Sequence, residues 1–222
     1  MYNSTMVYMR IIIATLTCLT CLLGDNFVEI SQNPLLKALA DNATHAAIGA
    51  LSGIAFVVQF YEKTSHFFGW LLIFVCFICS SLIDVDHFIA ARSWNLEDAT
   101  NLTRRPFLHC STLIALILIA YLSAACLNYF KWSLLLGSIL CAFVTHHSRD
   151  ATRRGYWIYP WGNTERISNL SYIIATIITP YIVGYLHSLC RAPTVQEYLG
   201  QYIKFNDNFN QREVRGYRYM QV

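Results

Sequence analysis

Charged side chains are scarce in this sequence of 222 residues. Aspartate, glutamate, lysine and arginine make up 13% of the chain, whereas 55% of it is hydrophobic, and the mean hydropathy is +0.40. Soluble domains carry about 25% charged residues. The composition therefore argues against a water-soluble globule, and it excludes a disordered chain, a collagen-like rod and a coiled coil.

Basic residues are few and scattered. The formal net charge of +3 is too small for the electrostatic footprint of a nucleic-acid-binding protein, so we expect no nucleic-acid partner. Eight cysteines are present, but most lie inside apolar segments, where cysteine behaves as a small hydrophobic residue. We interpret the C-x-x-C pairs that begin at Cys18 and Cys76 in this way, and we exclude a disulfide-stapled scaffold.

The apolar residues form continuous segments that are almost free of charge. A membrane helix needs about 17 to 25 such residues, and the segments lack the alternation of lipid-facing strands. The sequence therefore predicts an all-α fold, a multi-pass membrane helix bundle of five or six transmembrane helices, with the lipid bilayer as partner. We expect one domain over residues 1–190, with spans near 8–24, 43–61, 65–89, 107–130, 132–147 and 167–190.

The two ends of the chain leave alternatives open. The first apolar segment follows Arg10 like the apolar region of a signal peptide, but it has no convincing small-x-small cleavage site. We expect a retained helix. Residues 191–222 form a polar C-terminal tail in which aromatic and basic residues alternate, and this pattern fits either an amphipathic segment on the headgroups or a solvated tail.

Polar and ionisable residues cluster at four span ends. The clusters contain His45 at the start of the second span, Asp84, Asp86 and His87 at the end of the third, Arg104, Arg105 and His109 at the start of the fourth, and His146 and Asp150 at the end of the fifth. Counting the crossings places all four ends on the same membrane face. We therefore expect these distant clusters to meet at one level of the bilayer.

The residue types in these clusters point to a metal site. Ionisable groups at a membrane helix end are costly unless they pair, reach water or bind an ion, and histidine with carboxylate suits zinc, manganese or iron. If the helices continue, the i, i+3 pair Asp84/His87 and the i, i+4 pair His146/Asp150 each face one way. We predict a divalent metal site formed by His45, Asp84, Asp86, His87, His109, His146 and Asp150.

Three residues are candidates for catalysis. Arg104 and Arg105 present forked cationic donors that suit a phosphate or carboxylate on a substrate. Asp86 points off the Asp84/His87 face, so it is also expected either to orient a ligand histidine or to bridge a second ion. The polar clusters also have simpler interpretations. A lone His45 or His109 at a span end is often an interfacial residue, and the arginine pair is an ordinary topology signal.

These motifs resemble a known family. The segments Asp84-Val-Asp86-His87, Arg104-Arg105-Pro-Phe-Leu-His109 and His146-x-x-x-Asp150 follow His45 in the order found in bacterial inner-membrane proteins described as membrane-bound metal-dependent hydrolases. The resemblance covers about residues 41–189. It implies a metal site on the matched histidines and aspartates, although Arg104 stands where the bacterial motif has its first histidine.

Two functions follow from these observations. In the first, the site hydrolyses a lipid-like phosphoester or acyl substrate with metal assistance, and Arg104 or Arg105 holds the anion. In the second, the chain is a non-enzymatic membrane scaffold or partner-binding protein, and the polar clusters are structural networks. Transport is less favoured because no charged residue lies in the middle of a span.

Overall fold

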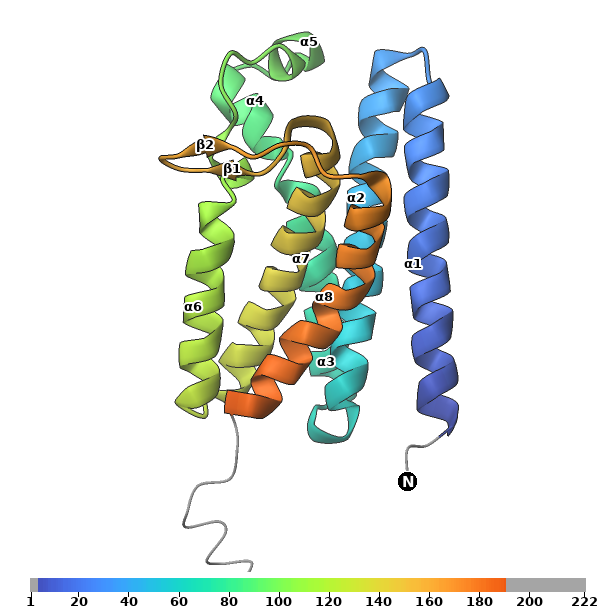
Figure 1. Ribbon diagram of the computed structural model, residues 1–222, viewed down its shortest axis with the longest axis vertical. Coiled ribbons are helices and arrows are strands. Elements are labelled where there is room, and N and C mark those ends of the chain that lie inside the picture. The colour runs from blue at the N-terminus through green and yellow to red at the C-terminus, as the bar shows by residue number, and fades with distance from the viewer. Residues whose placement is uncertain (1–3, 191–222) are drawn as a thin grey trace, which may run out of the picture.

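Long helices running side by side dominate the computed structural model, which describes residues 4–190 (Figure 1). The bundle contains α1 (Ser4–Ile30), α2 (Pro34–Val57), α3 (His66–Leu82), α6 (Thr112–Cys126), α7 (Phe130–Arg154) and α8 (Asn169–Cys190). The shorter elements are η1 (Val58–Lys63), α4 (Val85–Ala91), α5 (Leu96–Thr100), η2 (Phe107–His109), β1 (Trp157–Ile158) and β2 (Gly162–Asn163). The predicted tail at 191–222 lies outside the described residues.

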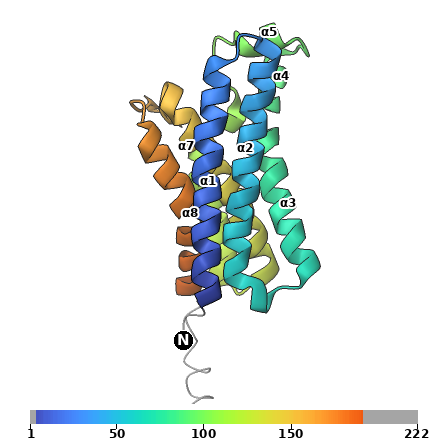
Figure 2. The same cartoon turned by 90° about the vertical axis from the view of Figure 1, so that its right-hand side faces the viewer.

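Several of these helices are suited to a bilayer. Four segments within residues 4–190 are long and apolar enough to cross a membrane: Ser4–Ile30, Pro34–Lys63, His66–Ala91 and Asn169–Cys190. The apolar helix α6 is shorter, and the last turns of α7 carry charged residues. The all-α membrane fold is confirmed. The predicted five or six spans exceed the four that meet this criterion, although α6 and α7 lie in the same bundle (Figure 1). Figure 2 shows α1 and α2 side by side, with α3 next to α2.

Local signals set several helix ends. The Asn33 side chain accepts hydrogen bonds from the backbone N–H groups of Leu35 and Leu36, and Pro34 occupies the first turn of α2, where its missing N–H costs nothing. Gly155 ends α7 with φ 70°. A Cβ at this glycine would collide with the carbonyl oxygen of Thr164, so the turn that leads into the β1–β2 hairpin requires glycine.

The central helices are α2 and α7, which both pack against α3 and α8 and against each other. The main hydrophobic core includes Phe56, Leu72, Tyr121 and Leu134, and it fills the half of the bundle remote from the polar clusters. Close to those clusters, α2 approaches α3 through Gly49. A Cβ added there would lie 2.5 Å from the Cβ of Ser80, which is the close backbone contact that small residues permit in membrane bundles.

The path of the chain brings the polar clusters to one end of the bundle. Successive long helices run in opposite directions, so the starts of α2, α6 and α8 and the ends of α1, α3 and α7 lie together (Figure 1). The helices α4 and α5 and the β1–β2 hairpin cover this end. The condition for one common face at Asp84 and His87 is not met, because α3 stops at Leu82 and α4 starts at Val85, and Asp84 lies in the turn between them.

Candidate metal centre

Four side chains offer ligand atoms to one point near this end of the bundle. Asp84, His109, His146 and Asp150 each have a ligand atom, and these atoms all lie within 4.8 Å of one another. Asp84 comes from the turn between α3 and α4, His109 ends η2, and His146 and Asp150 lie one turn apart on α7. We call these four residues the His/Asp cluster.

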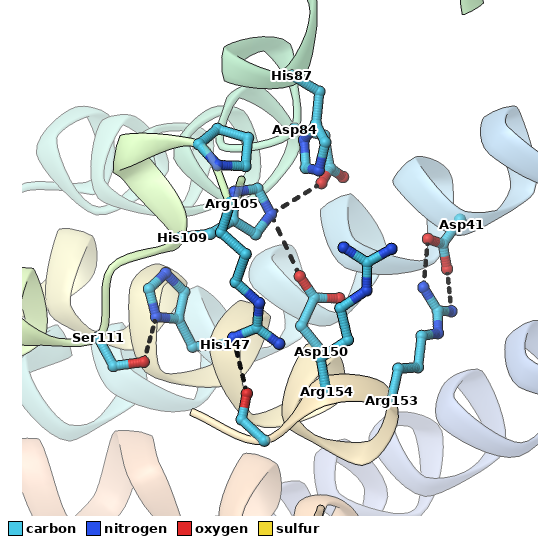
Figure 3. Close-up of a pocket in the computed structure, with 12 residues that line it drawn as sticks. Asp41, Asp84, His87, Arg105, His109, Ser111, His147, Asp150, Arg153 and Arg154 are labelled. Atoms are coloured by element: carbon cyan, nitrogen blue, oxygen red, sulfur yellow. Dashed lines mark hydrogen bonds and ion pairs between the residues drawn. The ribbon is translucent and has the colours of Figure 1, made fainter. Parts of the chain in front are cut away.

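Five of the six pairs of ligand atoms in the His/Asp cluster lie at similar distances. The Nε2 atom of His109 lies 3.4 Å from Asp84 Oδ1, 3.2 Å from Asp150 Oδ2 and 3.3 Å from His146 Nε2. His146 Nε2 lies 3.5 Å from the same two carboxylate atoms. Figure 3 shows the contacts of His109 with Asp84 and Asp150.

Both histidines of the His/Asp cluster are held through their other ring nitrogen. His146 Nδ1 lies 2.9 Å from the carbonyl oxygen of Ser80. His109 Nδ1 lies 3.1 Å from Asp86 Oδ1. Because a carbonyl or carboxylate oxygen only accepts, each Nδ1 carries a hydrogen, and Nε2 is the nitrogen that each ring turns toward the His/Asp cluster.

This arrangement gathers electron-pair donors around one point. Two imidazole nitrogens and two carboxylate oxygens converge, and such a set favours positive charge between them. The effect is visible at His109, which precedes α6. Burial alone would lower its pKa, but hydrogen bonds with Asp150, Asp84 and Asp86 raise the pKa of His109 to about 11.

The other predicted ligands surround the His/Asp cluster. Asp86 accepts a hydrogen bond from the backbone N–H of Leu108, with its Oδ2 atom at 2.7 Å, and it therefore fixes η2 as well as the ring of His109. His87 contacts the same carboxylate oxygen as His109, with its Nδ1 atom 3.3 Å from Asp86 Oδ1. Asp86, His87 and His109 form a second group whose ligand atoms lie within 4.8 Å of one another.

His45 is close to the His/Asp cluster but outside the group of converging ligand atoms. Its ring stacks on that of His146, with the centroids 3.8 Å apart. Its Nε2 atom lies 3.4 Å from Asp150 Oδ1, whereas the histidines of the His/Asp cluster approach Oδ2. His45 therefore contacts the oxygen of Asp150 that the histidines of the His/Asp cluster do not approach.

A small cavity opens onto the His/Asp cluster. Its volume is about 150 Å³, and its lining includes Asp84, His109 and Asp150 together with Arg105 and Arg154. His146 is fully buried. A water molecule or a substrate oxygen in this cavity would reach the His/Asp cluster from the side of the two carboxylates (Figure 3).

The two predicted arginines differ in position. Arg105 lines the small cavity, and its Nη1 atom donates to the carbonyl oxygen of Gly155 at 2.9 Å. Arg104 is exposed and lines two neighbouring cavities instead. Only Arg105 is therefore next to the His/Asp cluster.

Sequence reasoning missed a second polar network beside the His/Asp cluster. Arg149 is buried, with its Nε atom 2.8 Å from Asp25 Oδ1 and its Nη1 atom 2.8 Å from Asp41 Oδ1. Arg153 also binds Asp41 through two hydrogen bonds. The i, i+4 spacing of the two arginines on α7 was the available signal, but the sequence does not show which carboxylates they meet.

The chain is similar to known membrane proteins. The family model described as YdjM inner membrane protein matches residues 41–205. Transmembrane protein 267 of Mus musculus is 38% identical over 171 residues, which cover 75% of this chain and 77% of the mouse protein. The Bos taurus protein of the same name is 34% identical over 175 residues, covering 76% and 78%. No solved structure matches. The family match confirms the resemblance to bacterial inner-membrane proteins that the motifs indicated.

Proposed function

This chain belongs to the YdjM inner membrane protein family, and from its His/Asp cluster we propose that it is a membrane-embedded, metal-dependent hydrolase. Asp84, His109, His146 and Asp150 would hold one divalent ion, for which zinc, manganese and iron are the candidates. Asp86 and the carbonyl group of Ser80 orient the two histidines. Such supporting contacts raise ligand basicity and fix the tautomer in metalloproteins.

The spacing of the His/Asp cluster carries this proposal. Divalent ions such as zinc would hold nitrogen and oxygen ligands at about 2.0–2.2 Å, so neighbouring ligand atoms would lie about 3.0–3.5 Å apart. The five distances between atoms of the His/Asp cluster given above range from 3.2 to 3.5 Å. The donor set and these distances would therefore suit a divalent ion such as zinc, manganese or iron.

The surrounding residues fit hydrolysis of an ester. A bound divalent ion would supply Lewis acidity, and it would lower the pKa of a water molecule that bound it as a further ligand from the small cavity. Hydrolysis consumes one water molecule: its hydroxyl group bonds to phosphorus or to the acyl carbon, the ester bond breaks, and its proton goes to the leaving oxygen. Arg105 lines the cavity and is placed to pair with the anionic part of the substrate.

Metal content tests the proposal. We expect detergent-purified protein to contain about one divalent ion per chain by elemental analysis, and Asp84→Asn to lose it, because one of its four ligands becomes a weak one. His66→Ala is the matched control, since His66 is exposed and begins α3 at the opposite end of the bundle. Wild-type protein that purifies without metal, and that takes up none from a titration, would overturn the proposal.

The same variant separates catalysis from the scaffold alternative. A purely structural His/Asp cluster predicts that Asp84→Asn lowers membrane abundance and thermal stability without a change in metal content. A metal site predicts the reverse: the variant stays inserted and folded, and only the ion is lost.

A further inference from the structure

A second, larger cavity lies beside the His/Asp cluster. Its volume is about 880 Å³, and it is bounded by the end of α1, the first turns of α2, and α4 with α5. It shares Asp84, His87 and Arg154 with the small cavity, so the two meet at the His/Asp cluster. A volume of this size is in the range of small-molecule binding sites.

The walls of this large cavity are largely apolar. Val28 of α1, Leu35 and Leu39 of α2, Phe88 of α4 and Trp94 all line it. Trp94 also stacks on Phe88, with ring centroids 6.0 Å apart. An apolar cavity at the rim of a membrane bundle is suited to a hydrocarbon chain, because filling it removes apolar surface from water.

Cationic side chains stand where the cavities meet. Arg154 lines the small cavity, the large cavity and a third one that it shares with Arg104 and Arg105. Within residues 4–190, none of these three arginines forms an ion pair, whereas Arg149 and Arg153 are neutralised by Asp25 and Asp41. Arginine forks bind phosphate oxygens in pairs and keep their charge at any physiological pH.

We propose that the substrate is a lipid phosphate ester, with its acyl chain in the large cavity and its phosphate held by Arg104, Arg105 and Arg154. This inference rests on the proposed hydrolase function and selects the phosphoester over a neutral acyl ester. It places the phosphate at the cavity that opens onto the His/Asp cluster, and it assigns Arg154, which has no counterpart in the motifs above, to substrate binding.

Equilibrium binding tests this inference without turnover. Protein in nanodiscs, stripped of metal with EDTA, is titrated with 1-oleoyl-glycerol 3-phosphate, with monooleoylglycerol and with glycerol 3-phosphate. We expect the lipid phosphate to bind about tenfold or more tightly than either comparison ligand, because only it fills both parts of the site. If the neutral lipid binds as tightly as the lipid phosphate, the proposed phosphate site is wrong. If glycerol 3-phosphate binds as tightly as the lipid phosphate, the proposed acyl-chain site is wrong.

Variants locate the two parts of the site. Arg154→Gln should weaken binding of the lipid phosphate about tenfold and leave the neutral lipid unchanged. Arg166→Gln is the control, since Arg166 is exposed at the same end and outside these cavities. Ala38→Trp, which places a large side chain in the large cavity, should weaken binding of both lipids. An unchanged affinity of Arg154→Gln for the lipid phosphate overturns this inference. Failure of the proposed hydrolase function would instead appear in the metal content of the wild-type protein.

Discussion

His146 and His147 are neighbours in the sequence, but their rings have different partners. His146 presents Nε2 to the His/Asp cluster. His147 uses both nitrogens elsewhere: Nε2 lies 2.9 Å from the carbonyl oxygen of Leu108, and Nδ1 lies 3.1 Å from the hydroxyl of Ser111. Because a carbonyl only accepts, His147 donates through Nε2, which leaves no ring nitrogen for a metal.

This difference gives a prediction at the scale of single residues. His146→Ala should abolish metal binding, because it removes a ligand. His147→Ala should keep the metal but lower the free energy of unfolding by about 1–3 kcal/mol, since it leaves the buried acceptor of Leu108 without its donor. Elemental analysis and thermal unfolding followed by tryptophan fluorescence measure the two effects. Loss of metal in both variants would contradict the ligand assignment.

The turn between α3 and α4 shows what sequence patterns miss at the scale of elements. The i, i+3 spacing of Asp84 and His87 suggested one continuous helical face. Instead the helix breaks, and Asp84 and Asp86 both reach His109, one at each ring nitrogen. Periodicity describes residues on one regular element, so it cannot predict a break whose contacts are made with η2, a separate segment.

Close packing of α2 against α3 also supports the His/Asp cluster. Ser80 orients His146 through its carbonyl group and meets Gly49 of α2 with its side chain. We predict that Gly49→Val pushes α3 away from α2, lowers the free energy of unfolding by about 1–3 kcal/mol and weakens metal binding. Ala50→Val, at a half-buried position next to it on α2, is the control. Thermal unfolding and a chelator competition assay make the comparison, and similar effects of both variants would contradict this role of Gly49.

At the scale of the whole molecule, hydropathy predicted the membrane fold and the common level of the polar clusters, because alternating crossings leave little freedom in where helix ends lie. It did not predict which charged residues hold the bundle together. The Asp25 carboxylate looked like the end of the first span, yet α1 continues to Ile30. In the fold, Asp25 binds Arg149 of α7 and Tyr172 of α8. Both partners lie more than a hundred residues away in the sequence, so only the packing of the helices brings them to Asp25.

The pairing of Asp25 with Arg149 gives the last prediction, which concerns how α1 is attached to the bundle. Arg149 is 1% exposed, so Asp25→Leu leaves a buried guanidinium with Asp41 as its remaining carboxylate, and we expect a loss of about 3 kcal/mol in the free energy of unfolding. The double variant Asp25→Leu/Arg149→Met removes both charges, and it should be more stable than Asp25→Leu alone, because apolar pairs often replace buried ion pairs without loss. Thermal unfolding of the single and double variants in one detergent gives the coupling energy. Losses that simply add would mean that the two residues act independently, and that other contacts hold α1 in place.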